Sequence, residues 1–468
     1  MSIISKMKGW FKTLLVSKTK DEFHIEPIRS AEVDEWVGEC VNIYQGNPCW
    51  LDVEDHIDTV NFAKTLCSET ARLAMLGTGI SIDGSARAEW LQAQIDNLYY
   101  QLRHWVEYGC AYGTILLKPN GNTVEMYTRN RFEITHVTGD RIDGVVFSTQ
   151  ARTGGQWYTR LEYHRFSEDG LYHITNRCFT GDTPENTTRP VDIGATPWAD
   201  LQEEVTAGNV KRPLFAVFRT PQANNIDPDS PLGLPVFSET VQELRDLDIA
   251  YSRNAKEMRD SKRTVLLDSD VLLPSGGRVV QSPDAWERRR ADMKLPDYIK
   301  NVRSSAQETL YHEINPTLNT EARMTGINAL LNQIGYKAGF SNGYFVFNEA
   351  SGIQTATGVE AEQQRTIQYI KDVRDKLEGC LHDLIYALDV FADLYRLAPS
   401  GSYEVNCDFG DITYNRDEDR ARWWGYVSAN KVPAWLYFVK FEGMTEEEAK
   451  AMVEEAAPKA PTLFGGEE

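Results

Sequence analysis

The sequence lacks the closely spaced cysteines and the long apolar runs that would indicate a metal-binding or membrane-spanning protein. Its seven cysteines are scattered from Cys40 to Cys407 and include no Cys-x-x-Cys pair. Zinc knuckles need closely spaced ligands, so we expect no such site. An odd number of scattered cysteines fits reduced, intracellular thiols. No apolar run reaches the length that crossing a bilayer requires.

The local signatures of common enzyme classes are also missing. There is no Gly-x-Ser-x-Gly elbow and no His-Glu-x-x-His, and the glycines of residues 77–84 lack the residues that complete a P-loop. His136, His164 and His173 lie on strand-like runs without ligand spacing, so we expect each to be hydrogen-bonded or solvent-facing. The sequence therefore predicts no enzyme, no catalytic residues, no cofactor and no metal site.

What the sequence does have is length, aromatic content and negative charge. Its 468 residues are enough for two or more units with their own cores, and 11% aromatic residues argue against disorder. The formal net charge of −20 disfavours a protein that coats nucleic acid, because such proteins present basic surfaces to phosphate. The charge is compatible with a protein that lets nucleic acid pass without binding it tightly.

Residues 1–20 form a basic segment in which apolar side chains from Ile3 to Leu15 share one helical face between lysines. A helix lying on a membrane surface has this pattern, and so does an arm that docks on a neighbouring subunit. The segment lacks a small-residue cleavage site after a long apolar core, so we do not expect a signal peptide.

The next part of the chain predicts helices followed by an antiparallel meander. Helical patterns cover residues 31–44, 59–76 and 85–108. Apolar and polar residues then alternate from Tyr112 to Gly181, as expected of strands. Glycine-containing turns interrupt this region at residues 120–121, 139–140, 154–155 and 169–170, and turns of this kind between alternating runs are typical of hairpins.

The rest of the chain is arranged around the stretch from Pro235 to Gly358. Apolar residues at helical spacing predict one helix over 235–261 and another over 319–340. Between them lie a strand-like run and a turn, and after them comes a loop rich in glycine and small residues. A third helix is expected over 359–397. This pattern indicates two helices that bracket a small insert, joined by a loop to a long helix.

Past the third helix we expect a strand at 403–410, a helical run from Asp417 and a short helix capped by Thr445. Acidic residues gather around the first two of these elements, and they could be imagined as a two-metal nuclease site: Asp408, Asp411, Asp417, Glu418 and Asp419. Solvated acids on a strand end and an amphipathic helix are the other interpretation. The last residues, 456–468, are expected to be disordered.

Four segments in this order resemble those of tailed-bacteriophage portal (head–tail connector) proteins, and are most similar to the Gram-positive siphophage-like subfamily. The segments are Trp105–Pro119 with its Ala111-Tyr112-Gly113 step, 218–237 with Asn224, Asn225, Ser230, Pro231, Leu232 and Gly233, the loop 343–362, and 405–420 through 443–452. Two positions depart from the family: Leu234 and Pro235 follow where a serine is usual, and Gly358 stands where the family has an acid. The resemblance covers nearly the whole chain.

The resemblance implies an α+β portal fold with an antiparallel β-rich wing, a two-helix stem, a small α/β clip insert, a long helix after a tunnel loop and a mainly helical crown. The implied parts are a basic amphipathic arm (1–30), the wing (31–234), stem helix 1 (235–261), the clip (262–318), stem helix 2 (319–340), the tunnel loop (341–358), a long wing helix (359–397), the crown (398–455) and a disordered tail (456–468).

It also implies a function at one vertex of a viral capsid. A ring of about twelve copies would surround a channel. The terminase large subunit would pump double-stranded DNA through it during packaging, and DNA would leave through it at ejection. The further partners implied are the major capsid and scaffolding proteins and the head–tail adaptor, with no stable membrane contact. The protein would be assembled in the bacterial cytoplasm and reside in the virion.

Three groups of side chains are candidates for the channel and its contacts. Polar residues of the tunnel loop are Asn342, Tyr344, Asn348, Glu349 and Gln354, a basic cluster at the end of stem helix 1 is Arg253, Lys256, Arg259, Lys262 and Arg263, and the clip carries Arg288, Arg289 and Arg290. The stem cluster could relieve repulsion between DNA and an acidic channel, or be a solvated face paired with Glu257 and Asp260. The clip arginines could bind DNA or an acidic partner, or form salt bridges between subunits.

Two other interpretations of the sequence compete with that of a portal protein. One is a structural or membrane-associated scaffold that uses residues 1–20, and the other is the metal-dependent nuclease built on the acids near Asp408. Neither accounts for the order helix, insert, helix, loop and long helix.

Overall fold

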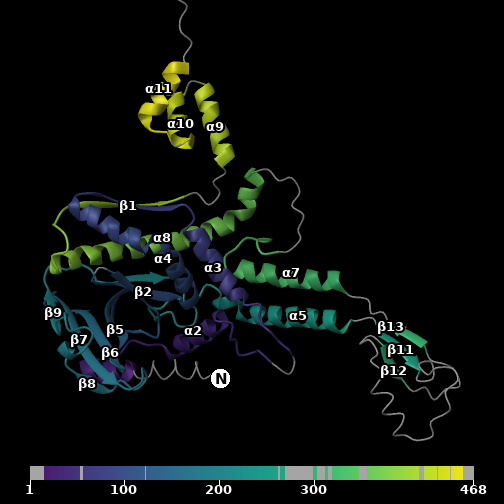
Figure 1. Ribbon diagram of the computed structural model, residues 1–468, viewed down its shortest axis with the longest axis horizontal. Helices are drawn as coiled ribbons and strands as arrows, with labels where there is room; N and C mark the ends of the chain where they lie inside the picture. The colour runs from purple at the N-terminus through teal and green to yellow at the C-terminus, as the bar shows by residue number, and fades with distance from the viewer. Residues whose placement is uncertain are drawn as a thin grey trace, which may run out of the picture. The chain divides into compact units, whose positions relative to one another are not determined.

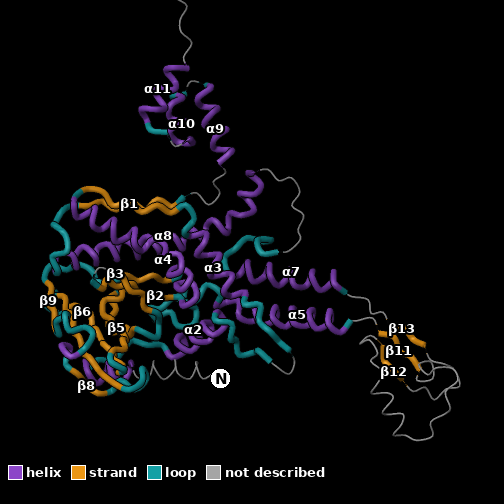
Figure 2. Tube along the Cα trace, in the orientation of Figure 1, coloured by secondary structure: helices purple, strands orange, loops and turns teal. Residues whose placement is uncertain are grey.

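The computed structural model describes residues 15–52, 56–121, 123–261, 264–268, 299–302, 311–314, 319–346, 356–410, 416–429, 431–442 and 444–456. The chain divides into two compact units. The larger comprises Met1–Met75 and Ile80–Cys407, and the smaller comprises Leu76–Gly79 and Asp408–Glu468. Helices and strands both contribute, which confirms the α+β class (Figures 1 and 2). Among the described residues, no helix combines the length and apolar character needed to cross a membrane.

The largest sheet of the larger unit is an antiparallel meander. Its strand order is β4-β5-β6-β7-β8, and β9 also pairs with β7. The strands are β4 (Phe132–Thr138), β5 (Arg141–Thr153), β6 (Gln156–Phe166), β7 (Tyr172–Gly181), β8 (Arg189–Val191) and β9 (Glu204–Ala207). The turns carry glycines with positive φ, among them Gly139 at 61° and Gly170 at 77°, a conformation that glycine adopts without steric penalty. The predicted meander is therefore confirmed.

Both faces of this sheet are covered, because successive side chains of a strand point to opposite sides. On β5, Val145 and Phe147 pack in a core that includes valines of helix α2 (Ala31–Tyr44). Val146, between them, packs with Leu15 of a helix at residues 15–23. Burial of each such side chain contributes about 1.5–3 kcal/mol relative to exposure, so the sheet is fixed from both sides.

A second, three-stranded sheet lies against the long helices of the larger unit. Its order is β10-β2-β3, with β2 at Thr114–Asn120, β3 at Thr123–Tyr127 and β10 at Ala216–Arg219. Helices α4 (Ala86–Tyr112) and α8 (Ala356–Leu394) both contact it, and α3 (Phe62–Ala74) packs on α4 and α8 (Figure 1). This sheet and its helices connect the meander to the segments that follow it.

Two buried arginines fasten α8 to its neighbours. Arg87 of α4 donates to the backbone oxygens of Asp389 and Pro399, at 2.7 and 2.9 Å, and it also pairs with the Asp393 carboxylate. Arg374 of α8 donates to the last carbonyls of α3, reaching the Ala74 oxygen at 3.0 Å. The end of α3 leaves its last carbonyls without intrahelical partners, and the fork of N–H donors on Arg374 can satisfy them.

Helices α5 (Val241–Asp260) and α7 (Thr320–Lys337) flank a small insert, as predicted. The expected start of the first helix at Pro235 is wrong by about two turns. Val236 donates its N–H to the Cys110 oxygen at 3.0 Å, and Phe237 is fully buried, so this stretch belongs to the core and a short 3-10 turn, η2 (Ser238–Thr240), precedes the helix.

The described part of the insert is a three-stranded sheet of order β12-β11-β13. Its strands are β11 (Thr264–Asp268), β12 (Ile299–Val302) and β13 (Tyr311–Ile314). β11 pairs in parallel with β12 and antiparallel with β13. Along the chain, this sheet follows the last residue of α5 and precedes the first residue of α7. These are the ends of the two helices that are remote from η2.

The last strand of the larger unit runs into the smaller unit. Strand β14 (Tyr403–Phe409) pairs with β1 (Thr78–Gly84). The second stretch of the smaller unit begins at Asp408, within β14. Helices α9 (Arg416–Ser428), α10 (Ala434–Glu442) and α11 (Glu446–Ala456) follow.

Thr445 caps α11 as predicted. The backbone N–H of Glu448 donates to the Thr445 hydroxyl at 3.4 Å, and the Thr445 N–H donates to the Glu448 carboxylate at 3.1 Å. This reciprocal pair is a capping box, which satisfies two backbone donors at the start of the helix.

Candidate functional site

The helix pair α5–α7 is antiparallel, and ion pairs join the two helices near both ends. Lys337, at the end of α7, lies 2.6 Å from Glu243 at the start of α5. Arg323, near the start of α7, pairs with Glu257 near the end of α5. Glu243 is buried, so its contact with Lys337 is less screened by water than a surface pair would be.

The half of this pair nearer the insert is open to solvent. In α5 the last buried residue is Ser252, and in α7 the first is Ile327. Two apolar side chains of α5 are nonetheless half exposed, Tyr251 at 51% and Met258 at 52%. They are seven residues apart, which places them on the same side of the helix two turns from each other. The pair therefore presents apolar surface that the described residues of this chain do not cover.

The candidate basic cluster is only partly within the described residues. Arg253, Lys256 and Arg259 are exposed on the last turns of α5, whereas Lys262 and Arg263 lie outside the described residues. The clip arginines Arg288, Arg289 and Arg290 lie outside them as well. Glu257, which could have paired within α5, is engaged by Arg323 of α7.

The chain after α7 forms a turn at residues 341–346 that holds two of the candidate loop residues. Asn342 is exposed there. Tyr344 is half-buried, and its hydroxyl donates to the Glu69 carboxylate of α3. Burial, followed by the hydrogen bond to Glu69, raises the pKa of Tyr344 to about 12. The remaining candidates Asn348, Glu349 and Gln354 lie outside the described residues.

Aromatic packing holds this turn in place. The ring of Phe345 lies 5.1 Å from that of Phe62 on α3 and 4.8 Å from that of Phe340, in edge-on arrangements. Gly343, with φ of 79°, donates its N–H to the Asn332 side-chain oxygen at 2.5 Å. Aromatic pairs of this geometry contribute about 0.5–1.5 kcal/mol each beyond burial, so the first residues after α7 are part of the packed body.

A second polar feature, which sequence reasoning missed, is a buried charge cluster between β2 and β6. The Glu162 carboxylate lies 2.6 Å from the Lys118 ammonium and 2.9 Å from the Arg160 guanidinium. His164 lies 2.9 Å from the same carboxylate and 3.0 Å from the Tyr172 hydroxyl. Arg160, Glu162 and His164 alternate with apolar residues along β6, so the sequence pattern could not distinguish them from a solvent-facing row.

The cluster perturbs the ionisation of its members. Burial raises the pKa of Glu162, but Lys118, Arg160 and His164 outweigh burial and hold this pKa well below its ordinary value. Burial lowers the pKa of Lys118 and of His164, and in each case Glu162 offsets part of that effect. The carboxylate is therefore ionised at neutral pH, and the imidazole is neutral.

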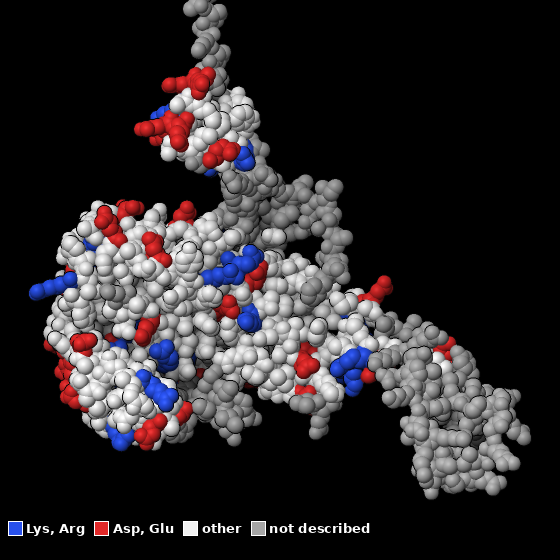
Figure 3. All heavy atoms as spheres, in the orientation of Figure 1, with Lys and Arg blue, Asp and Glu red and all other residues white. Residues whose placement is uncertain are grey.

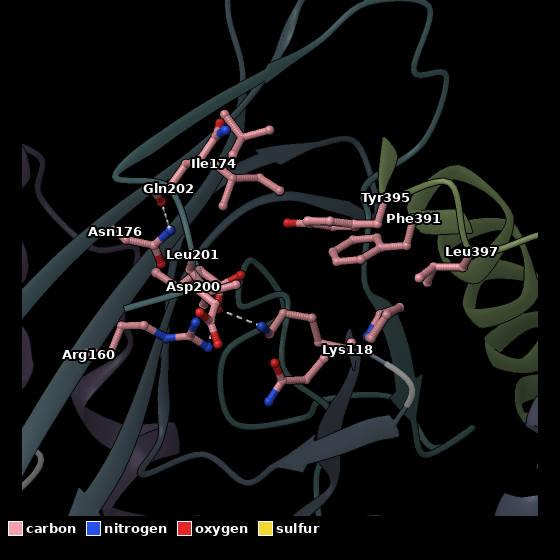
Figure 4. Close-up of a pocket in the computed structure, with 15 residues that line it drawn as sticks. Lys118, Arg160, Ile174, Asn176, Asp200, Leu201, Gln202, Phe391, Tyr395 and Leu397 are labelled. Carbon is pink, nitrogen blue, oxygen red and sulfur yellow. Dashed lines mark hydrogen bonds and ion pairs between the residues drawn. The ribbon is translucent and has the colours of Figure 1, made fainter. Parts of the chain in front are cut away.

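The cluster lines one wall of a cavity of about 300 Å³ (Figure 4). Its other walls come from β7, the segment 200–205 and the end of α8: Asn176, Asp200, Leu201, Gln202, Phe391, Tyr395 and Leu397. Among the residues that the structure describes, Nε of the buried Arg160 has no hydrogen-bond partner, and neither has Oδ1 of Asn176. Lys118 and Arg160 share the lining with the carboxylates of Glu162 and Asp200, so basic and acidic side chains are balanced in it.

The histidines lie as predicted. His136 is exposed, His164 belongs to the cluster, and His173 lies within hydrogen-bonding distance of Ser167 and Thr206, at 3.2 and 3.1 Å.

Of the acids considered for a nuclease, Asp408 is exposed on β14 and Asp411 lies outside the described residues. Asp417, Glu418 and Asp419 belong to α9, but their side chains are outside the described part. On the face in Figure 3, acidic and basic side chains of the described residues are interspersed.

No protein-family model and no curated protein matches this sequence. Solved structures that share similarity with the chain include two from gene transfer agent (GTA) particles. One is a chain of the neck of an empty GTA particle computed with C6 symmetry, at 10% identity and a TM-score of 0.44, covering 89% of this chain and 96% of that one. The other is a chain of the virion of a native GTA particle, at 11% identity and a TM-score of 0.44, covering 92% and 98%. At these values neither likeness carries an argument about this protein.

Proposed function

We propose that this chain is a portal subunit, the head–tail connector of a tailed bacteriophage. Copies of it would form a ring at one capsid vertex, through which the terminase packages double-stranded DNA and through which DNA is later ejected. One observation carries the proposal: the order α5, strand insert, α7, packed turn and the 39-residue helix α8. This is the order of stem, clip, stem, tunnel loop and long helix that the sequence resemblance implies.

The exposed apolar surface of α5 supports assembly into a ring. Half-exposed Tyr251 and Met258 lie on one side of a helix that lacks buried residues beyond Ser252. In a closed ring each subunit presents one face to the subunit before it and another to the subunit after it. A neighbouring copy would cover these side chains, and burial of each would contribute about 1.5–3 kcal/mol.

The negative charge suits a channel through which DNA slides. Each phosphate that a protein neutralises adds to its affinity through counterion release, so a strongly basic channel would hold the duplex. A net charge of −20 acts against such retention. Exposed Arg253, Lys256 and Arg259 would moderate the repulsion at the end of α5.

Negative-stain electron microscopy of the purified full-length protein, averaged without imposed symmetry, tests the proposal. We expect end-on views of rings whose central hole admits a duplex. A Tyr251→Ser, Met258→Ser double variant should shift rings towards monomers, whereas Tyr100→Ser, which alters an 83% exposed side chain of α4, should leave them intact. A chain that stays monomeric on concentration and with its capsid partners would refute the portal assignment.

A further inference from the structure

Three potential metal ligands meet where β14 passes α8. Glu378 and His382 are on the helix and Cys407 is on the strand, and each is partly buried. One ligand atom from each side chain lies within 4.8 Å of the ligand atoms of the other two. The Glu378 carboxylate and the His382 imidazole are 3.8 Å apart.

The local structure explains this meeting. Residues four apart on a helix lie on the same face, which brings Glu378 and His382 together. Burial alternates along β14, so Tyr403, Val405 and Cys407 share its less exposed side. The Tyr403 hydroxyl lies 3.4 Å from the Asp389 carboxylate of α8, which shows that this side of the strand faces the helix.

We propose that Glu378, His382 and Cys407 bind one Zn²⁺ ion per chain. Thiolate, imidazole and carboxylate are the three side-chain ligands that zinc uses in proteins, and zinc accepts all three in a tetrahedral shell. Ca²⁺ and Mg²⁺ prefer oxygen ligands throughout, so the thiol and the imidazole disfavour them. Three protein ligands leave the fourth position for water.

Solvent can reach the ligands on their open side. His382, Tyr403 and Val405 line a hollow of about 540 Å³ next to the cluster. This hollow offers both an entry path for the ion and room for a bound water, which a metal site requires.

The ion would fasten the chain at its exit from the larger unit. Cys407 is the last residue of that unit, and Asp408 is the first of the following stretch of the smaller one. Bound zinc would tie this exit to α8 and stabilise the folded chain, because the unfolded chain does not hold the three ligands together. The inference is independent of the proposed portal function.

The sequence alone did not indicate this site, because Cys407 follows His382 by 25 residues and forms no motif with it. The available signal was the pair Glu378 and His382, whose spacing of four is common among helical zinc ligands.

Isothermal titration calorimetry of the chelator-treated, reduced full-length protein with Zn²⁺ tests the proposal. We expect one Zn²⁺ per chain, and Co²⁺ should give the absorption band of a cobalt–thiolate bond. Cys407→Ser should abolish that band, and both Cys407→Ser and His382→Ala should weaken binding by about tenfold or more, since even outer-shell partners contribute that much. The matched control is Cys49→Ser, because Cys49 is also a thiol beside a carboxylate but is exposed.

Three results would overturn the proposal: no Zn²⁺ uptake by the reduced protein, uptake unchanged in Cys407→Ser, or uptake lost in Cys49→Ser. Circular dichroism checks that each variant is folded. If Cys407→Ser does not fold, the outcome rests on His382→Ala and Glu378→Gln, whose side chains are about 40% exposed. Undiminished Zn²⁺ affinity in both of these would equally refute the site.

Discussion

Ser341 and Thr366 bind each other through both backbone and side chain. The N–H of Ser341 donates to Oγ1 of Thr366 at 2.8 Å, and the N–H of Thr366 lies 3.2 Å from Oγ of Ser341. Both residues are buried. The pair fixes the residue that follows Phe340 to α8, so in the proposed portal the root of the tunnel loop is attached to the long helix.

Replacing Thr366 by valine tests this attachment. The variant keeps the shape of the side chain but leaves the buried Ser341 N–H without its acceptor, which should destabilise the chain by about 1–3 kcal/mol. Urea-induced unfolding measures the loss. Thr366→Ser, which retains the hydroxyl, should lose less, and equal losses in the two variants would show that the hydrogen bond is not the cause.

The buried cluster predicts a large effect at Glu162. Glu162→Gln removes the carboxylate that contacts Lys118, Arg160 and His164, and so leaves two buried cations without this ion-pair partner. Breaking a buried ion pair on one side costs about 3–5 kcal/mol. Glu203→Gln is the matched control, because Glu203 pairs with Arg177 at the surface and should change stability by at most about 0.5 kcal/mol. Similar unfolding midpoints for the two variants would contradict the prediction.

His164 makes stability depend on pH on the acid side of neutrality. Its pKa in the folded chain is lowered from 6.5, first by burial, so below pH 6.5 the unfolded chain binds a proton that the folded chain does not. Stability is therefore fully present above pH 6.5 and falls as the pH decreases towards the folded pKa, by up to about 1.4 kcal/mol per pH unit.

The difference in unfolding free energy between wild type and His164→Gln, followed from pH 7.5 to 5, isolates this contribution from the other histidines. The wild type should lose stability more steeply. Parallel curves for the two proteins would mean that His164 protonates equally in both states.

Two glycines meet where α4 passes into β2. A methyl group on Gly113, whose φ is 74°, would lie 2.2 Å from the backbone oxygen of Gly233. We expect Gly113→Ala to destabilise the chain by more than about 1 kcal/mol, because strain in φ adds to the clash. Gly326, inside α7, has open space around it, and Gly326→Ala should stabilise by about 0.5–1 kcal/mol. Thermal unfolding of the pair checks the opposite signs.

Local patterns in the sequence were enough to predict much of the fold. The helix over 31–44 and the glycine turns of the meander depend on spacing and φ preferences within a few residues, and both are confirmed. The start of α5 was not predictable in this way. Val236 and Phe237 have helical spacing, but Val236 is hydrogen-bonded to Cys110, over a hundred residues earlier, and Phe237 is fully buried. Tertiary burial overrode a local preference.

The candidate site residues show the same difference between positions that the local sequence decides and positions that distant contacts decide. The sequence marked Tyr344 as a polar loop residue, yet its ring packs beside Phe345 and its hydroxyl reaches α3. Arg160 and Glu162 look like a solvent-facing row in the sequence, because only strand pairing and the covering helices decide which face of β6 is buried. The sequence pattern does not predict the position of a side chain whose contacts come from residues distant in the sequence.

Helix α8 is held by contacts at three places, which act as its supports. Ser341 holds it at Thr366, α3 holds it at Arg374, and Arg87 of α4 holds the turn that ends it. The supports come from different parts of the chain, so sliding along the helix axis by one turn, about 5.4 Å, would have to break all three at once. The three contacts therefore resist displacement of α8 along its axis.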